Sequence, residues 1–216
     1  LGALRWSQGN YPEALTYFEK AQGIFREAYG ERGSSYARTL SNIGSALGMQ
    51  GKYLESEEYH RKAVETYIAT FGPDHSYVAL AQNNLADNYV GLSDFAEAER
   101  LLRRTTEILL HAYGRESLPY GRNLERLGNL YGRRGEYERA RVILEEARAC
   151  YLSAVGDKHP DYAGSLTQIA SAYRHLGRLD EASKLLEEAR GLQESLLGKS
   201  HPDYAGTTLT LAAVRF

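Results

Sequence analysis

The apolar positions of the chain recur with a fixed period of 42 residues, for example from Ile43 to Leu85. One slot is apolar in every copy, and the slot after it always holds Gly or Ala. The apolar slot holds Leu1, Ile43, Leu85, Leu127, Ile169 and Leu211. Glycines keep the same interval without an insertion or deletion, at Gly30, Gly72, Gly114, Gly156 and Gly198. A period of this size is typical of stacked-repeat proteins, in which each unit buries its apolar face against its neighbours.

Each copy divides into two predicted helices, most clearly in the copy that covers 162–203. Residues 162–175 predict a first helix, because apolar side chains recur there every three or four positions. Gly177 then suits the left-handed conformation that ends many helices. A second helix begins near Asp180 and extends to Leu197. Pro202 cannot continue it, so the next copy begins there.

The turn inside each copy carries glycine at Gly9, Gly51 and Gly135 as well, whereas Ser93 departs from this pattern. At the start of the first helices, short polar side chains are predicted to act as N-terminal caps. These predicted caps are Ser35, Asp161 and Asp203, while Tyr77 and Pro119 in the same slot cannot serve. Pro12 falls where the first turn of a second helix tolerates proline.

We therefore predict an all-α solenoid of antiparallel helix pairs that forms one domain over 1–216. The predicted units are a partial repeat 1–35, full repeats 36–77, 78–119, 120–161 and 162–203, and a partial repeat 204–216. Neither end carries the polar helix that caps a free solenoid, so we expect the natural protein to continue in both directions. We also expect exposed Trp6, Val214 and Phe216 to permit end-to-end self-association.

Two motifs of the fourth copy match a known repeat family. Leu127-Gly128-Asn129-Leu130-Tyr131 reads L-G-x-x-Y, and 140–144 reads A-x-x-x-F with Leu144 in place of Phe. These motifs resemble the tetratricopeptide repeat (TPR), over the whole chain. The longer period, Asn83-Asn84-Leu85-Ala86 and the G-x-x-H-P-D connections at 156–161 and 198–203 resemble the kinesin light chain type.

The resemblance implies a right-handed superhelix whose first helices line a concave groove that binds peptide segments. In this family a polar amide slot contacts the peptide backbone. The slot falls on Asn42, Asn84, Arg126 and Gln168, of which Arg126 departs from the amide pattern. A neighbouring slot falls on Ser45, Asp87, Asn129 and Ser171, where Asp87 would oppose an acidic ligand.

An arginine stripe is the strongest local signal in the sequence. It consists of Arg122, Arg126, Asn129 and Arg133, at spacings that place them on one side of a helix. Arginine has a planar fork suited to carboxylate, so an acidic peptide is a natural ligand. The alternative is a solvated face whose arginines pair with Glu125 and with neighbouring helices. Arg38 and Arg174 would extend the stripe on other first helices.

Composition excludes several classes of partner. The net charge is -2 and the pI about 6.4, so no basic field favours nucleic acid. No apolar run approaches the roughly 20 residues needed to span a membrane. The single cysteine, Cys150, fits a reducing compartment, so we expect a cytoplasmic protein in which this thiol is packed inside a helix pair.

No catalytic or metal-binding signature emerges from the sequence. His75, His159 and His201 recur once per repeat, so we expect them to form hydrogen bonds in turns and not to converge on a metal. The remaining histidines, His60, His111 and His175, are interpreted as structural or surface residues. Hydrolase, phosphate-loop and zinc-protease motifs are missing from the sequence. We expect no enzyme activity, metal or cofactor.

The leading functional hypothesis is a protein-protein interaction scaffold that binds an acidic or polar peptide segment in its groove. The alternative is a regulatory or sensor segment that packs against another domain of a larger signalling protein, a use that such arrays also have. In both cases the predicted partner is a protein, not a nucleic acid or a membrane.

Overall fold

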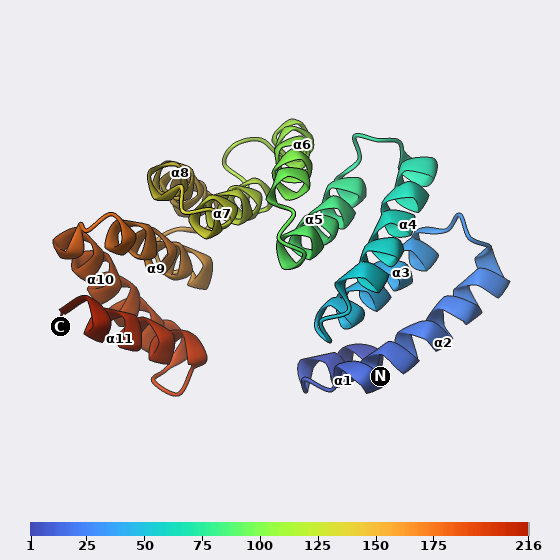
Figure 1. Cartoon of the computed structure of the whole chain (residues 1–216), viewed down its shortest axis with the longest axis horizontal. Coiled ribbons are helices and arrows are strands. Elements are labelled where there is room, and N and C mark those ends of the chain that lie inside the picture. Colours follow the sequence, from blue (N-terminus) through green and yellow to red (C-terminus); the bar gives the residue numbers. More distant parts are fainter. Residues whose placement is uncertain (216) are drawn as a thin grey trace. The chain divides into compact units, whose positions relative to one another are not determined.

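The computed structural model describes residues 1–215, and all elements in this range are α-helices (Figure 1). In chain order the helices are α1 (Gly2–Ser7), α2 (Tyr11–Tyr29), α3 (Ser34–Gly48), α4 (Tyr53–Phe71), α5 (Ser76–Gly91), α6 (Phe95–Tyr113), α7 (Leu118–Arg133), α8 (Tyr137–Val155), α9 (Pro160–His175), α10 (Leu179–Leu197) and α11 (Pro202–Arg215). The predicted all-α class is confirmed, and the two helices expected in 162–203 are α9 and α10.

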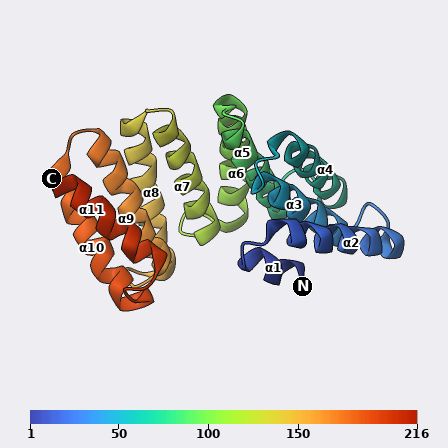
Figure 2. The ribbon, with the colours of Figure 1, turned by 60° about the horizontal axis from the view of Figure 1, so that its bottom comes forward.

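The chain forms two compact units, Leu1–Ala112 and Tyr113–Phe216. In the first unit α1 to α5 pack consecutively, and α3 also contacts α5. The second unit repeats this plan from α7 to α11, and its first helices α7, α9 and α11 contact in sequence. Figure 2 shows α8, α9 and α10 of this unit side by side. Helix pairs that stack in chain order are the arrangement of a solenoid. That the chain forms a single domain over 1–216, and that the superhelix is right-handed, stay predictions.

Close contact between paired helices depends on the small slots. In the second unit, a Cβ added to Gly128 of α7 would lie 2.6 Å from Cγ of Leu144 in α8. That distance is too short for two carbon atoms, so only glycine lets α7 approach α8 at this point. Ala140 of α8 and Ala182 of α10, in another small slot, are also buried. The apolar slot is buried at Ile43, Leu85, Leu127, Ile169 and Leu211, and exposed at Leu1.

The turn between paired helices needs a left-handed residue. Gly135 and Gly177 have φ of +77° and +75°, which glycine adopts without steric cost. Ser93 adopts φ of 62° in the same slot, and it is the one non-glycine residue with positive φ in the described part of the chain. Ser93 therefore adopts the same left-handed backbone conformation as the glycines in the matching turns.

The predicted N-terminal caps are wrong. Imidazoles cap the first helices: Nδ1 of His159 accepts a hydrogen bond from the backbone N–H of Asp161 at 3.1 Å. Nδ1 of His75 and of His201 accept in the same way from the residue two positions on. Asp161 lies inside the first turn of α9, where its carboxylate is available for another partner. At Ser35 the helix begins one residue earlier, and its cap is Gly33, without a side-chain bond.

The expected exposure at the chain ends is partly wrong. Val214 is only 7% exposed, because it packs in the core that α9, α10 and α11 share. Trp6 is half-buried and meets the ring of Tyr11 edge-on, with centroids 5.1 Å apart. Phe216 lies outside the described residues. Cys150 is buried as expected, and burial raises the pKa of its thiol.

His60 is a polar side chain in an apolar position. It is 3% exposed, its Nδ1 has no hydrogen-bond partner, and burial lowers its pKa to about 4. A Cβ added to Gly44 would lie 2.8 Å from the His60 ring, so this ring packs directly against the backbone of α3. The matching position in α8 is Leu144, beside Gly128. The His60 imidazole thus occupies the place that a leucine side chain has in the matching position of α8.

We predict that Ser93→Gly stabilises the protein. A left-handed residue with a side chain costs roughly 1–2 kcal/mol, and the extra freedom of unfolded glycine returns part of that gain. The expected increase in the free energy of unfolding is about 0.5–1 kcal/mol, measured by urea denaturation. Gly135→Ser, the reverse change in the matching slot, should destabilise; equal stability of all three proteins would contradict the account.

We predict that His60→Leu removes a pH dependence of stability. The folded histidine binds a proton only near pH 4, whereas the unfolded one does so near 6.5. The unfolded state therefore gains the proton first, so stability is complete above pH 6.5 and falls between 6.5 and 4. The loss is on the order of 3 kcal/mol for this shift. Denaturation at pH 7 and pH 4.5 should show that the native chain loses stability at the lower pH and that His60→Leu does not. An equal change in the free energy of unfolding in both proteins would contradict the role given to His60.

Candidate functional site

The first helices of the second unit present matching stripes of side chains. On α7 the stripe is Arg122, Arg126, Asn129 and Arg133, as the sequence predicts. The positions 42 residues later, on α9, are Gly164, Gln168, Ser171 and His175. Because α7 contacts α9, these two stripes lie on neighbouring helices.

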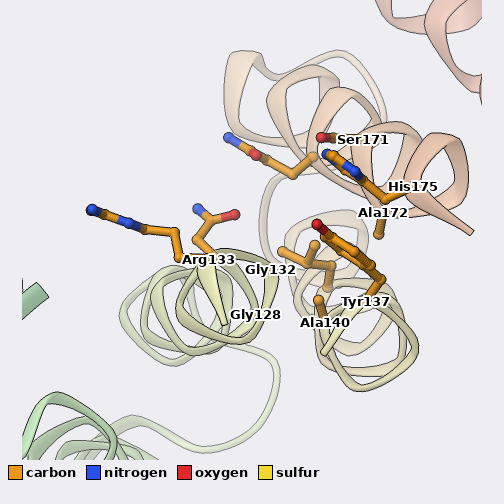
Figure 3. A pocket seen from close by; sticks show the side chains of 11 residues that line it. Gly128, Gly132, Arg133, Tyr137, Ala140, Ser171, Ala172 and His175 are labelled. Carbon is orange, nitrogen blue, oxygen red and sulfur yellow. The ribbon is translucent and has the colours of Figure 1, made fainter. Parts of the chain in front are cut away.

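A hollow of about 300 Å³ lies where α7, α8 and α9 meet, and we call it the α7–α9 hollow (Figure 3). Its polar and aromatic lining residues are Asn129, Arg133, Tyr137, Gln168, Ser171 and His175. The structure therefore brings three of the predicted binding residues together in one place: Asn129, Arg133 and Gln168.

One wall of this hollow is a stacked pair of rings. Tyr137 of α8 and His175 of α9 lie parallel, with centroids 4.3 Å apart and planes 3° apart. The side chain of Arg133, which also lines the hollow, extends from α7 away from this pair (Figure 3). None of the described lining residues is acidic. The hollow combines amides, one aromatic wall and positive charge, which suits a polar chain with a carboxylate.

Arg122 is engaged by the neighbouring helix. Its Nε and Nη2 donate to one carboxylate oxygen of Asp161, at 2.9 and 2.7 Å. Asp161 stands in the first turn of α9, free for this role because His159 supplies the cap. This contact matches the alternative of arginines that pair with neighbouring helices, so Arg122 ties α7 to α9.

Glu125 lies beside the stripe and is half-buried. The hydroxyl of Tyr151, fully buried in α8, donates to its carboxylate at 2.6 Å. Burial raises the pKa of Glu125, although the bond from Tyr151 opposes that effect. The same burial, with the negative charge of Glu125, raises the pKa of the Tyr151 hydroxyl. The hydroxyl of Tyr151 on α8 thus holds the carboxylate of Glu125 in place.

A second hollow, of about 540 Å³, lies between α9 and α11, and Gln193 of α10 also lines it; we call it the α9–α11 hollow. Gln168 lines this hollow as well as the α7–α9 hollow, so the two are neighbours on α9. Its polar lining includes three carboxylates, three threonines and two amides. They are Glu125, Asp161, Asp203, Thr167, Thr207, Thr210, Gln168 and Gln193.

The other predicted binding residues are distributed over both units. Arg174 is exposed in the last turn of α9, where its Nη2 lies 3.2 Å from Nε2 of His175. Arg126 is half-buried on α7. In the first unit, Arg38 is exposed and Asn42 half-buried on α3, and Asn84 is half-buried on α5. Their membership in one groove stays a prediction.

Sequence reasoning misses three lining residues. It interprets His175 as a structural or surface residue, although this histidine stands in the slot of Arg133. Neither Tyr137 nor Gln193 is singled out from the sequence. Comparing each slot across the five second helices would have found Gln193, the only amide in its slot.

His75, His159 and His201 form the hydrogen bonds that the sequence predicts for the turns between helices. Within residues 1–215, no three His, Cys, Asp or Glu side chains are grouped so that they could hold a metal ion. None of the helices described above is long and apolar enough to cross a membrane.

A family model described as tetratricopeptide repeat matches residues 1–68, 35–111, 119–195 and 161–216. The chain belongs to the tetratricopeptide repeat family. The TPR assignment made from the L-G-x-x-Y motif is thereby confirmed over nearly the whole chain. The comparison with curated proteins gave no match.

Solved structures of TPR proteins share this fold. A putative kinesin light chain with nearly identical TPR-like repeats, from Podosopora anserina, is 22% identical, with a TM-score of 0.73 over 91% of this chain and 93% of that one. BtubC (BKLC) from P. vanneervenii is 22% identical, with a TM-score of 0.78 over 94% and 80%. The Rap conjugation gene regulator of plasmid pLS20, in complex with the Phr* peptide, is 18% identical, with a TM-score of 0.79 over 99% and 56%. These likenesses confirm the kinesin light chain-like TPR fold.

We predict that Glu125→Gln stabilises the protein at neutral pH more than at acidic pH. A buried carboxyl with a raised pKa holds its proton more tightly when folded, so stability falls as pH rises above 4.5 through the folded pKa. The amide keeps an acceptor for Tyr151 and carries no charge. Urea denaturation at pH 7 and pH 4 should show a gain that shrinks at the lower pH.

The matched control is Glu146→Gln, where a carboxylate that is paired with Arg115 accepts from Tyr120 at 3.1 Å. A gain of the same size at both pH values in Glu125→Gln would contradict the charge-burial explanation.

Proposed function

We propose that the first-helix face of the second unit binds an extended peptide segment of a partner protein and anchors an acidic side chain of it. The TPR fold is a scaffold suited to protein-protein interaction. The observation that supports a site here is the α7–α9 hollow, which gathers Asn129, Arg133 and Gln168.

The chemistry of the lining gives each residue a role. A carboxamide both donates and accepts, so Asn129 and Gln168 can pair with the N–H and C=O groups of a peptide backbone. Such contacts hold an extended chain without reading its sequence. Arg133 offers a planar fork that suits a carboxylate. The stacked rings of Tyr137 and His175 give the peptide an aromatic surface beside these polar groups.

A relative supports the proposal in outline. The Rap regulator of plasmid pLS20, whose structure includes the Phr* peptide, has the same fold. In the first unit, Arg38, Asn42 and Asn84 occupy matching first-helix positions on α3 and α5. We assign them to a peptide-contacting face of that unit. Arg122 ties α7 to α9 through Asp161, so we assign it and its neighbour Arg126 a supporting role.

The proposal predicts that the chain selects acidic peptides from a displayed library of random linear peptides. The Arg133→Glu variant should lose that preference, because it places a like charge where the carboxylate binds. For a selected peptide, measured by fluorescence anisotropy, we expect affinity to fall by about tenfold or more. Gln168→Ala should weaken binding of all selected peptides, acidic or not.

Lys184→Glu is the matched control, an exposed charge reversal on the second helix α10. It changes the net charge equally and should leave selection unchanged. Selection of acidic peptides by Arg133→Glu as strongly as by the native chain would overturn the proposed site.

A further inference from the structure

One buried position breaks the repeat beneath the α9–α11 hollow. The slot in the second helices is apolar or aromatic in four copies and an amide in the fifth. Its residues are Phe25, Tyr67, Leu109, Tyr151 and Gln193. Tyr151 shows what the slot does elsewhere in the second unit, because its ring is fully buried and its hydroxyl bonds Glu125. Gln193 is smaller than a tyrosine and leaves space under α9 and α11.

The amide of Gln193 lacks a donor for its oxygen. The side chain is only 3% exposed, and its Oε1 has no hydrogen-bond partner. Buried acceptors in folded proteins are nearly always paired, so an orphan that lines a hollow indicates a missing donor. The group that completes it must bring an N–H or O–H into the α9–α11 hollow.

The charge around this orphan oxygen favours a cationic donor. Glu125, Asp161 and Asp203 line the hollow, and no Lys or Arg does among its described lining residues. Asp161 is already paired with Arg122, whereas the Asp203 side chain is 62% exposed and lies 3.6 Å from His201. Thr167 and Thr207 are hydrogen-bonded to each other at 3.1 Å and add further acceptor oxygens.

We propose that the α9–α11 hollow binds a basic side chain, lysine or arginine, of the same peptide whose acidic side chain lies at the α7–α9 hollow. Gln193 and Asp203 accept hydrogen bonds from that cation. This inference rests on the proposed function, and it adds a second specificity site and a charge pattern. The pattern is bipolar, because one hollow carries arginine and histidine while its neighbour carries carboxylates.

The spacing of the two charges follows from the fold. Packed helices lie about 8–10 Å apart, and an extended peptide advances about 3.3 Å per residue. Gln168 lines both hollows, so a segment that crosses α9 passes over it. The basic residue should therefore lie about three positions from the acidic one in selected peptides.

The first test uses peptides selected from the displayed random library by the native chain. We expect the selected peptides to carry an acidic and a basic residue at this spacing. The Gln193→Tyr variant, in which a tyrosine fills the slot as Tyr151 does, should no longer select peptides for the basic residue. Gln193→Leu should behave likewise, and because Leu109 occupies the same slot we expect that variant to remain folded. Unfolding midpoints at or above that of the native chain establish this.

The second test is a double-mutant cycle by fluorescence anisotropy. Replacing lysine with norleucine in a selected peptide, or Asp203→Asn in the protein, should each weaken binding by about fivefold, and the combination by little more than either alone. Asp180→Asn, an exposed carboxylate in the first turn of α10, is the control and should not couple to the lysine.

The outcomes separate the two proposals. If acidic peptides are selected but neither Gln193→Leu nor Asp203→Asn changes the basic preference, the cation site is wrong and the peptide-binding proposal stands. If the cation site binds lysine but Arg133→Glu has no effect, the acidic anchor is wrong. If no peptide is selected, both are overturned.

Discussion

The close approach of paired helices at the small slots is the constraint on which the structure depends. Gly128 lets α7 reach Leu144 of α8, and Gly44 of α3 meets His60 of α4 in the same way. Helices that approach so closely bury their apolar stripes in each other and leave the opposite stripe of each first helix outside the core. The fold therefore fixes one face and leaves the other open to change.

Departures from the repeat consequently carry most of the information about what the protein does. His60 and Gln193 are both polar residues in apolar slots of second helices, with an unpaired atom each. They differ in surroundings: His60 meets Gly44 inside a closed pair, whereas Gln193 opens into a hollow. We interpret the first as a cost to stability and the second as a site that a ligand completes.

Much of the fold could be predicted because it depends on local spacing. Glycine and proline positions, small slots and apolar slots place α9 and α10 within two residues. The helix caps could not be predicted in this way. The choice between His159 and Asp161 depends on the residue at which α9 begins, and the helix begins at Pro160, directly after His159. The ion pair of Arg122 and Asp161 could not be predicted either, because it joins two residues that are 39 positions apart in the sequence. In the site, amide and arginine positions followed from the repeat, while the hollows themselves depend on side-chain volume.

The central claim is that the stripe shared by α7 and α9 contacts a peptide, with Gln168 between two hollows. The most direct measurement is the NMR signal of the side-chain amides during titration of the intact chain with a library-selected peptide. The account predicts that the amides of Asn129, Gln168 and Gln193 shift together with saturation, while the backbone amide of Lys184 on α10 does not. A shift of the Lys184 signal, with the signals of Asn129 and Gln168 unmoved, would contradict it.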